Sequence, residues 1–273
     1  MPKMLRDEFP SIIDIAYREY IKYKHVSDIM TRNVITIGSD TTVYYAAKVM
    51  GELHIGSLVV EEGNRAAGIF TERDYISRVL LQNLDPKLTT VKEVMRTSLT
   101  TIKPTATIKE AAREMIRENS KWLLILEHGK PIGIVTASDL VRALPEAAEA
   151  EIVVDDFMTK NVVSVPHDTL TKEAVEIMGR KNIGSVLVTR GERFWGIFTE
   201  RDLLSKVASR DLPIDVPVEN YASTPLITIP SGMSIHRAAL TMAVKHIRRL
   251  PVERDGEIIG IITARDLIEA YAR

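Results

Sequence analysis

The chain has 273 residues, with 36 Lys and Arg against 37 Asp and Glu, and it contains no cysteine. This length corresponds to roughly two domains, and the balanced charge argues against a dedicated nucleic-acid surface. The missing cysteines exclude disulfide scaffolds, thiolate nucleophiles and cysteine-bound zinc or iron–sulfur centres.

The first 24 residues are predicted to form an N-terminal helix that packs on the rest of the chain. Apolar residues over 11–24 recur at the spacing of an amphipathic helix. No signal peptide is recognised, and no stretch approaches the roughly 18 apolar residues of a spanning helix. We therefore expect a cytoplasmic location and no membrane contact.

A short motif occurs four times along the chain: Gly, two apolar residues, Thr, two variable residues and Asp. Its last residue falls at positions 74, 139, 202 and 266, so successive copies are 65, 63 and 64 residues apart. Such constant spacing indicates one supersecondary unit copied along the chain. In the first three units a methionine precedes the motif Asp by 44 residues (Met30, Met95 and Met158). The predicted repeats cover residues 25–82, 88–144, 150–208 and 212–273.

Repeat 2 shows the order of elements within a unit most clearly. Apolar residues at 108, 111, 112, 115 and 116 predict a helix over about 107–118. Two apolar runs at 122–126 and 132–135, separated by a turn signal, predict a β-hairpin, and a second helix follows from 139 to 143. With an opening short strand, each unit is strand, helix, strand, strand, helix, which is an α+β arrangement.

Repeats 1 and 3 resemble each other more than their neighbours, sharing the endings GIFTERD and the central Ile-Gly-Ser. An ancestral pair was therefore duplicated, and we expect repeat 1 to pair with repeat 2 and repeat 3 with repeat 4. The Ala- and Glu-rich segment 145–151 is the expected linker between the pairs.

The Thr-x-x-Asp part of the motif has two interpretations. A helix cap uses these residues, because the Thr side chain and the acid three residues later satisfy free backbone N–H groups. A nucleotide site also uses them, because an acid can accept ribose hydroxyls. Arg precedes the Asp in three copies (Arg73, Arg201 and Arg265), and an Arg beside a helix start can hold phosphate. The pattern favours a nucleotide, with capping alone as the alternative.

A second basic position lies at the start of the first hairpin strand in the even repeats, at Lys121, Arg248 and Arg249. The odd repeats have small residues there, at Gly56, Ser57, Gly184 and Ser185. Small residues leave room for a ring and long cations suit its phosphate end, so odd and even repeats look complementary. The alternative is that these cations only discourage strand pairing at an edge.

These residues make the repeat similar to the cystathionine β-synthase (CBS) domain, of which two copies form a Bateman module. The resemblance covers about residues 25–273 and rests on four copies of the motif. Four copies in one chain resemble the regulatory γ subunit of AMP-activated protein kinase and its stand-alone archaeal relatives. The resemblance implies four repeats paired into two Bateman modules that form a disc and sense AMP, ADP or ATP.

The resemblance also implies a set of ligand-binding residues, assigned by their place in each repeat. Ribose would be held by the motif pairs Thr71 with Asp74, Thr136 with Asp139, Thr199 with Asp202, and Thr263 with Asp266. Adenine would lie by the first short strand and the small residues, at Ile35, Thr100, Val163, Ile227, Ile55, Gly56, Ser57, Ile183, Gly184 and Ser185. Phosphates would meet Arg73, Arg201 and Arg265, with help from Lys121 or from Arg248 and Arg249 of the partner repeat. On this basis repeats 1 and 3 rank as the strongest sites, then repeat 4, then repeat 2.

An enzyme is the main competing class, but no nucleophile-elbow, P-loop, dinucleotide or zinc-protease motif occurs. The six histidines show no metal-ligand spacing. We therefore expect no catalysis, no metal and no cofactor beyond a regulatory adenine nucleotide. S-adenosylmethionine or a dinucleotide in the same clefts, and an interaction scaffold with empty clefts, stay open. The regulated partner protein is unknown, and association into a homodimer is left open.

Overall fold

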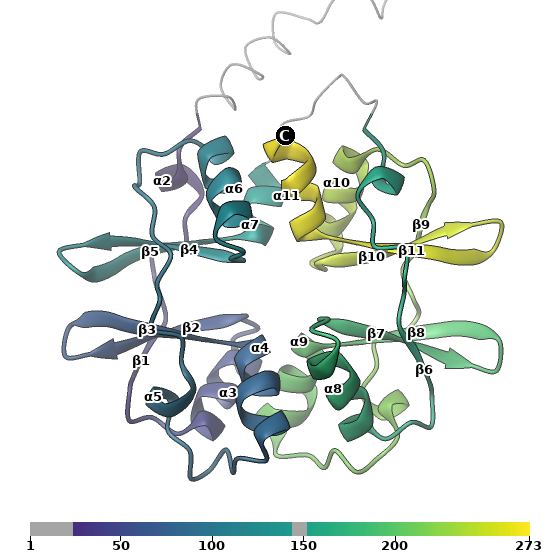
Figure 1. The fold of residues 1–273 in the computed structure, drawn as a ribbon, viewed down its shortest axis with the longest axis horizontal. Coiled ribbons are helices and arrows are strands. Elements are labelled where there is room, and N and C mark those ends of the chain that lie inside the picture. Colours follow the sequence, from purple (N-terminus) through teal and green to yellow (C-terminus); the bar gives the residue numbers. More distant parts are fainter. Residues whose placement is uncertain (1–23, 144–151) are drawn as a thin grey trace, which may run out of the picture.

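The computed structural model describes residues 24–143 and 152–273. The predicted N-terminal helix, apart from residue 24, and the linker predicted at 145–151 lie outside these described residues. Figure 1 shows the four repeats at the corners of a disc, with the hairpins of repeats 1 and 2 on one side and those of repeats 3 and 4 on the other.

Repeats 1 and 3 share one order of elements. Repeat 1 comprises α2 (Val26–Ile29), β1 (Thr36–Gly38), α3 (Val43–Glu52), β2 (Ser57–Glu62), β3 (Arg65–Thr71), α4 (Glu72–Asp74), η1 (Tyr75–Val79) and η2 (Leu80–Gln82). Repeat 3 comprises η3 (Val154–Asp156), β6 (Ser164–Pro166), α8 (Thr171–Arg180), β7 (Ser185–Arg190), β8 (Arg193–Thr199), α9 (Glu200–Asp202), η4 (Leu203–Val207) and η5 (Ala208–Arg210).

Repeats 2 and 4 close with a regular α-helix instead. Repeat 2 comprises α5 (Val91–Val94), α6 (Ile108–Arg117), β4 (Trp122–Glu127), β5 (Lys130–Thr136) and α7 (Ala137–Ala143). Repeat 4 comprises η6 (Val218–Asn220), β9 (Ile229–Pro230), α10 (Ile235–Lys245), β10 (Arg249–Arg254), β11 (Glu257–Thr263) and α11 (Ala264–Ala272).

The predicted α+β order is confirmed, with two differences. The helix and hairpin predicted in repeat 2 are α6 and the antiparallel pair β4–β5. Every repeat additionally begins with a short helical turn that the periodicity did not reveal, because three or four residues are too few to show a period. The first strand of repeat 2 is reduced to a single parallel bridge between Thr101 and Leu124.

The opening turn of each repeat packs on the partner repeat of its pair. In the first pair α2 contacts α7 and β5 of repeat 2, while α5 of repeat 2 contacts β3 of repeat 1. Antiparallel bridges fix this exchange, joining Thr31 to Ile134 and Ile69 to Arg96. The second pair has the same exchange, with Thr159 bridged to Ile261. The predicted pairing of repeats 1 with 2 and 3 with 4 is therefore confirmed.

This exchange explains why a Met and a Gly recur in the repeats. A side chain added at Gly133 would overlap Met30 Sδ, and the same holds for Gly68 with Met95 and Gly260 with Met158. Gly196 instead faces the backbone of Ser223 in repeat 4, which is the repeat without the Met. The Met of one repeat thus packs on the motif Gly of its partner.

We predict that Gly133→Ala lowers the free energy of unfolding by about 1–3 kcal/mol, because the new methyl group overpacks against Met30. Met30→Ala makes room, so the double variant should lose less than the sum of the single losses. Urea denaturation measures the cycle. Gly38→Ala is the control, since its Cβ would meet only Thr41 Oγ1, at 3.8 Å; additive losses at Met30 and Gly133 would contradict the packing.

Two apolar cores hold the pairs together into the disc. One core joins repeats 1 and 3, through buried residues such as Met50, Phe70, Met178 and Phe198. The other joins repeats 2 and 4, through residues such as Met115, Leu140, Met242 and Leu267. A smaller cluster between the hairpins of repeats 1 and 2 contains Val59, Ile69, Trp122 and Leu124. Each repeat therefore packs against two others, around a common centre.

Close contacts between the odd repeats place their motif residues together. Gly51 on α3 allows close approach to the backbone of Leu204 in η4, and Gly179 on α8 does so for the side chains of Ile76 and Leu81. The receiving segments η1 and η4 each form a π-helical turn, a geometry often found at functional sites. As a result α4 contacts α9 at the centre of the disc.

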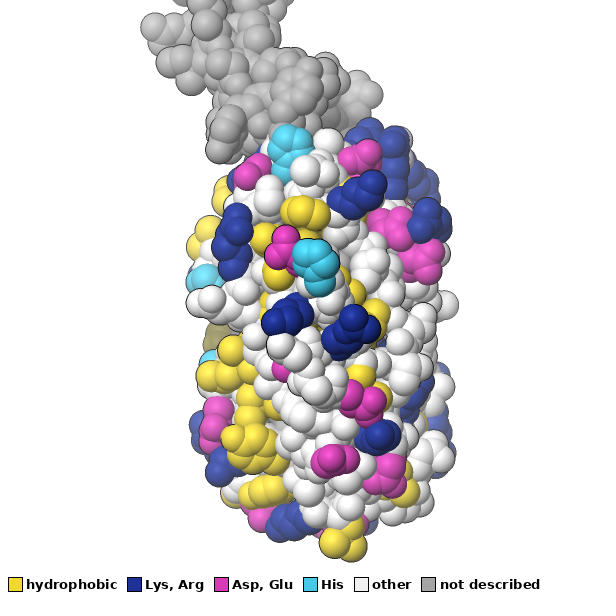
Figure 2. All heavy atoms as spheres, turned by 90° about the vertical axis from the view of Figure 1, so that its left-hand side faces the viewer, with side chains coloured by type: hydrophobic (Ala, Val, Ile, Leu, Met, Phe, Trp, Pro, Cys, Tyr) yellow, Lys and Arg dark blue, Asp and Glu magenta, His cyan; other side chains and the backbone are white. Residues whose placement is uncertain are grey.

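The edge of the disc formed by the hairpins of repeats 1 and 2 carries basic and acidic side chains side by side (Figure 2). This edge therefore presents no continuous basic stripe of the kind that tracks a phosphate backbone. Within the part of the chain that the structure describes, no helix has the length and apolar content needed to cross a membrane.

Candidate functional site

The capping interpretation of the motif holds in all four repeats. In repeat 1, Asp74 Oδ2 accepts hydrogen bonds from the Thr71 backbone N–H at 3.1 Å and from Thr71 Oγ1 at 2.6 Å. The same pair of bonds joins Thr136 to Asp139, Thr199 to Asp202, and Thr263 to Asp266. One carboxylate oxygen of every motif Asp is thus engaged by its own helix start.

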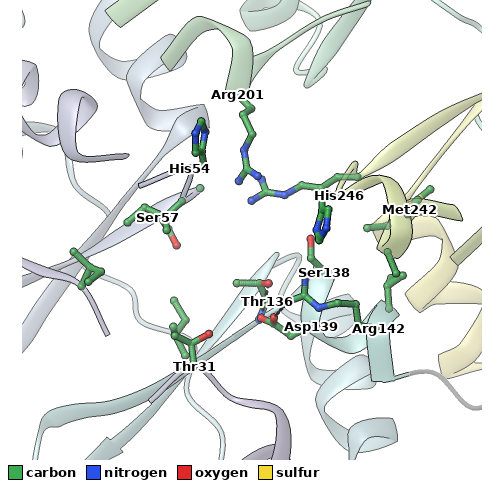
Figure 3. A pocket seen from close by; sticks show the side chains of 18 of the residues that line it. Thr31, His54, Ser57, Thr136, Ser138, Asp139, Arg142, Arg201, Met242 and His246 are labelled. Atoms are coloured by element: carbon green, nitrogen blue, oxygen red, sulfur yellow. Dashed lines mark hydrogen bonds and ion pairs between the residues drawn. The ribbon is translucent and has the colours of Figure 1, made fainter. Parts of the chain in front are cut away.

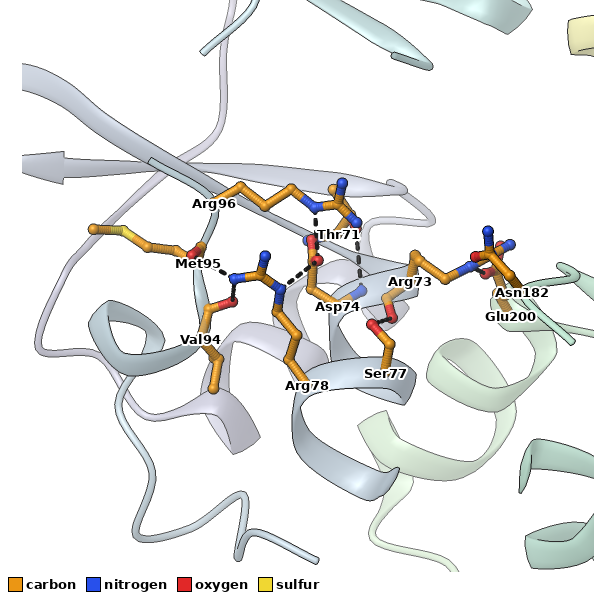
Figure 4. A network of polar contacts seen from close by, with 10 residues as sticks. All are labelled: Thr71, Arg73, Asp74, Ser77, Arg78, Val94, Met95, Arg96, Asn182 and Glu200. Carbon is orange, nitrogen blue, oxygen red and sulfur yellow. Dashed lines mark hydrogen bonds and ion pairs between the residues drawn. The ribbon is translucent and has the colours of Figure 1, made fainter. Parts of the chain in front are cut away.

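In the odd repeats, protein groups also engage the second oxygen. Asp74 is fully buried, and its Oδ1 lies 2.8 Å from Arg96 Nε and 3.5 Å from Arg78 Nε (Figure 4). Asp202 Oδ1 accepts a hydrogen bond from Ser223 Oγ at 2.7 Å and lies 2.8 Å from Lys206 Nζ. Both carboxylates are therefore already saturated by the protein.

The even repeats leave the second oxygen nearer to solvent. Asp139 Oδ1 pairs with Arg142 one turn along α7, and both side chains line a pocket. Asp266 Oδ1 has no hydrogen bond or ion pair from residues 24–143 or 152–273. Burial raises the pKa of Asp266 above its ordinary value, and Glu269 adds to this, against the bonds from Thr263. The accessible motif carboxylates thus belong to repeats 2 and 4.

A pocket of ≈ 270 Å³ lies between repeats 1 and 2 (Figure 3). It unites predicted residues from all four repeats: Ile35, Ile55, Gly56 and Ser57 from repeat 1, Thr136 and Asp139 from repeat 2, Arg201 from repeat 3 and Arg248 from repeat 4. Residues that the sequence did not indicate complete its wall, among them Thr31, His54, Ser138, Arg142, Met242 and His246. In Figure 3 the Ser57, Thr136 and Arg201 side chains point into the same space.

The inner end of this pocket carries two arginines and a buried glutamate. Arg201 Nε lies 3.2 Å from Glu72 Oε1, and Arg248 Nη1 lies 3.0 Å from Glu72 Oε2. A Cβ at Gly56 would come within 2.9 Å of Arg248 Nη1 and 3.2 Å of Glu72 Oε2. Glycine is therefore needed at this position for the arginine to reach the glutamate.

The equivalent corner between repeats 3 and 4 has the same construction. Gly184 faces the guanidinium of Arg249 and the carboxylate of Glu200. Arg73 reaches across from repeat 1 to pair with Glu200 and with Asn182 (Figure 4). Asn182 and His54 occupy equivalent helix ends, both in the left-handed region with φ 54°.

Each corner therefore takes its arginine from the other pair of repeats. Arg73 was expected to act with Lys121 in the cleft of its own pair, and Arg201 with Arg248 and Arg249 in theirs. That assignment is wrong for two of these side chains: Arg73 lies at the corner of repeats 3 and 4, and Arg201 at the pocket of repeats 1 and 2. The contact between α4 and α9 turns each motif arginine toward the opposite pair.

The enclosed centre is rich in positive charge. Five cations (Arg73, Lys121, Arg201, Arg248 and Arg249) surround the two buried carboxylates, Glu72 and Glu200. Burial opposes ionisation of Glu200, but Lys121, Arg73 and Arg249 outweigh it, so the pKa of Glu200 is lowered. Arg201 Nη2 is buried and has no hydrogen-bond partner among the described residues. An unpaired buried donor beside surplus positive charge is a place for an anion.

Lys121 responds to the same surplus. Its side chain keeps contact with solvent, while the four repeats enclose it at longer range. This enclosure lowers the pKa of Lys121, and Arg73 and Arg249 lower it further, against Glu200 and Glu72. Burial likewise lowers the pKa of Arg249 and of Arg201.

The other predicted residues lie around the second corner or away from both. Ile183 and Ser185 flank Gly184, and the Val163 carbonyl accepts a hydrogen bond from the Leu187 N–H at 2.9 Å. Arg265 precedes Asp266 on α11, at the position that Ser138 occupies in repeat 2. Ile227 is exposed just before β9. In the described ranges, no three His, Asp or Glu side chains gather closely enough to hold a metal ion.

Glu72 and Glu200 are the main residues that the sequence prediction missed, since they fall in a variable position of the motif. A signal existed, because Glu precedes the motif Arg only in repeats 1 and 3, which also carry the Gly-Ser corner. The even repeats have Ala137 and Ala264 instead.

Comparison with known proteins supports the repeat assignment. The family model of the CBS domain matches residues 26–81, 91–146, 154–209 and 218–273. The uncharacterized protein MJ1404 of Methanocaldococcus jannaschii is 28% identical over 266 residues, which are 90% of this chain and 62% of that protein. Hypoxic response protein 1 of Mycobacterium tuberculosis is 32% identical over 127 residues, 46% of this chain and 89% of that protein.

Two solved structures share the arrangement of all four repeats. The crystal structure of MJ1225 from Methanocaldococcus jannaschii, proposed to be an archaeal homologue of g-AMPK, has a TM-score of 0.78 at 24% identity and covers 91% of this chain and 100% of that one. An uncharacterized conserved protein from Pyrococcus horikoshii has a TM-score of 0.63 at 24% identity, covering 90% and 99%. At this identity the likeness establishes the fold.

Proposed function

Because the chain belongs to the CBS-domain family, with four repeats that pair into two Bateman modules, we propose that it is a non-catalytic regulatory module that binds adenine nucleotides. The ligands would occupy the pocket between repeats 1 and 2 and the equivalent corner between repeats 3 and 4. Their binding would signal the energy state to a partner protein.

The observation that carries this proposal is the chemistry of the pocket between repeats 1 and 2. One wall has the apolar side chains of Ile35 and Ile55, which suit a base. Asp139 presents a carboxylate near solvent for ribose hydroxyls, and the unpaired Nη2 of Arg201 lies beside Arg248 for phosphate. A volume of ≈ 270 Å³ is at the lower end of ligand pockets, which span about 300–1,000 Å³. It therefore favours one mononucleotide over a dinucleotide.

Calorimetry with AMP, ADP, ATP and S-adenosylmethionine tests the proposal. We expect two binding events with adenine nucleotides, with Kd on the order of micromolar, about −8 kcal/mol. S-adenosylmethionine carries a positive sulfur and should bind weakly beside Arg201 and Arg248. Tight binding of S-adenosylmethionine alone, or no heat with any of the four at millimolar concentration, would replace the proposal with one of the alternatives. Mass spectrometry of small molecules released from the purified protein identifies a ligand without assuming one.

Nucleotide binding should be accompanied by proton uptake at alkaline pH. An anionic phosphate near the centre favours the charged form of Lys121 and raises its lowered pKa toward the ordinary 10.5. Between the lowered pKa and 10.5, the ligand-free protein holds fewer protons than the complex, so binding takes up protons. The unfolded chain also holds more protons there, so stability rises with pH through this window.

Calorimetry in two buffers of different ionisation enthalpy counts these protons. The wild-type protein should show an uptake that grows as the pH approaches 10.5 from below, and Lys121→Met should abolish it. An uptake that survives in Lys121→Met would assign the titration to another group.

A further inference from the structure

Glu72 and Glu200 are carboxylates held inside the cluster of cations, with exposures of 6% and 3%. Glu72 contacts Arg201 and Arg248. Glu200 contacts Arg73 and is surrounded by Lys121 and Arg249. Each glutamate therefore occupies the arginines of one cleft, at its inner end.

Capping does not account for these glutamates. Thr71 and Asp74 form the capping box of α4, and Thr199 and Asp202 form that of α9. The even repeats start their closing helices with the same box chemistry and an Ala in place of Glu. Burying a carboxylate is costly unless cations compensate for it. The place of Glu72 and Glu200 thus follows from the arginines and not from the helix start.

The phosphate of a bound nucleotide and the glutamate of the same cleft would compete for the same guanidinium groups. Arg201 has one free donor, Nη2, and uses Nε for Glu72. A phosphate can take the free donor without displacing the glutamate, but it then lies close to a second negative charge. Repulsion between the two grows in proportion to the charge on the ligand.

We propose that Glu72 and Glu200 set the ligand charge that the clefts accept, favouring nucleotides with few phosphates over triphosphates. This inference rests on the proposed nucleotide binding and adds the residues that determine ligand preference. The competing explanation is that the glutamates only position the arginines, in which case their removal weakens every phosphate ligand.

The variant Glu72→Gln separates the two explanations, because glutamine keeps a hydrogen-bond acceptor for Arg201 and Arg248 but carries no charge. ATP carries about twice the negative charge of AMP, so its gain in log Kd should be about twice as large. We expect the Kd for ATP at the first cleft to fall about tenfold and that for AMP about threefold. Glu200→Gln should act in the same way at the second corner. Glu127→Gln, at the exposed end of β4, is the matched control and should change neither.

Calorimetry gives both Kd values, and thermal melting shows that each variant is folded. Weaker binding of both nucleotides, or equal gains for both, overturns charge selection while leaving nucleotide binding in place. No binding of any nucleotide to wild type or variant overturns the proposed function and this inference together. The wild-type protein supplies a test that needs no variant: it should bind ATP no more tightly than AMP, and ATP tighter by tenfold or more overturns the proposal.

Discussion

Asp139→Ala is expected to weaken nucleotide binding to the pocket between repeats 1 and 2 by at least tenfold, about 1.4 kcal/mol. Its Oδ1 is the motif carboxylate oxygen of that pocket that is not buried in protein contacts, apart from its ion pair with the exposed side chain of Arg142. Losing two hydrogen bonds to ribose hydroxyls accounts for a change of this size. Calorimetry with AMP measures it. Loss of the helix cap adds about 0.5–2 kcal/mol of destabilisation, which thermal melting follows separately.

The matched control is Asp74→Ala in repeat 1, where the same motif residue is fully buried. Its removal takes away the cap and the partner of Arg96 and Arg78. We expect a loss of about 2 kcal/mol of unfolding free energy and an unchanged Kd. If Asp74→Ala lost affinity and Asp139→Ala did not, the ligand would lie against the odd repeats, as their richer motif first indicated.

The repeat architecture could be predicted because local signals agree at every level. The spacing of the motif Asp residues, the apolar period over α6 and the turn between β4 and β5 each depend on residues close together in the sequence. The pairing of repeats followed from the greater likeness of repeats 1 and 3. The function of the methionine did not follow, because Met30 and Gly133 meet only through the exchange of opening segments.

The site was only partly predictable, for the same reason. The sequence placed the correct residue types at the centre, including Gly56, Arg201 and Arg248. It could not show that Arg96, 22 residues from Asp74, saturates that carboxylate, nor that Glu72 pairs with Arg201, 129 residues away. Partners so far apart in sequence leave no periodicity. The ranking of repeats 1 and 3 as the strongest sites depended on Arg73 and Arg201 acting in their own pair, which the fold does not allow.

The crossing of arginines between pairs leads to the second large effect. Arg201 belongs to repeat 3 but lines the pocket of repeats 1 and 2, so Arg201→Ala should weaken nucleotide binding there by about tenfold or more, the value of a hydrogen bond between charged groups. Arg73→Ala should instead weaken binding at the corner of repeats 3 and 4, where Arg73 meets Glu200 and Asn182.

Double variants assign each arginine to its cleft. With Asp139→Ala already disabling the first pocket, adding Arg201→Ala should change the Kd of the remaining site by less than about twofold, because both changes act on one ligand. Adding Arg73→Ala to Asp139→Ala should weaken the remaining site by about tenfold. The reverse result would mean that each arginine serves its own pair. Agreement would show that neither pair of repeats holds a complete phosphate site alone, so that a ligand in one cleft depends on how the two pairs are held together.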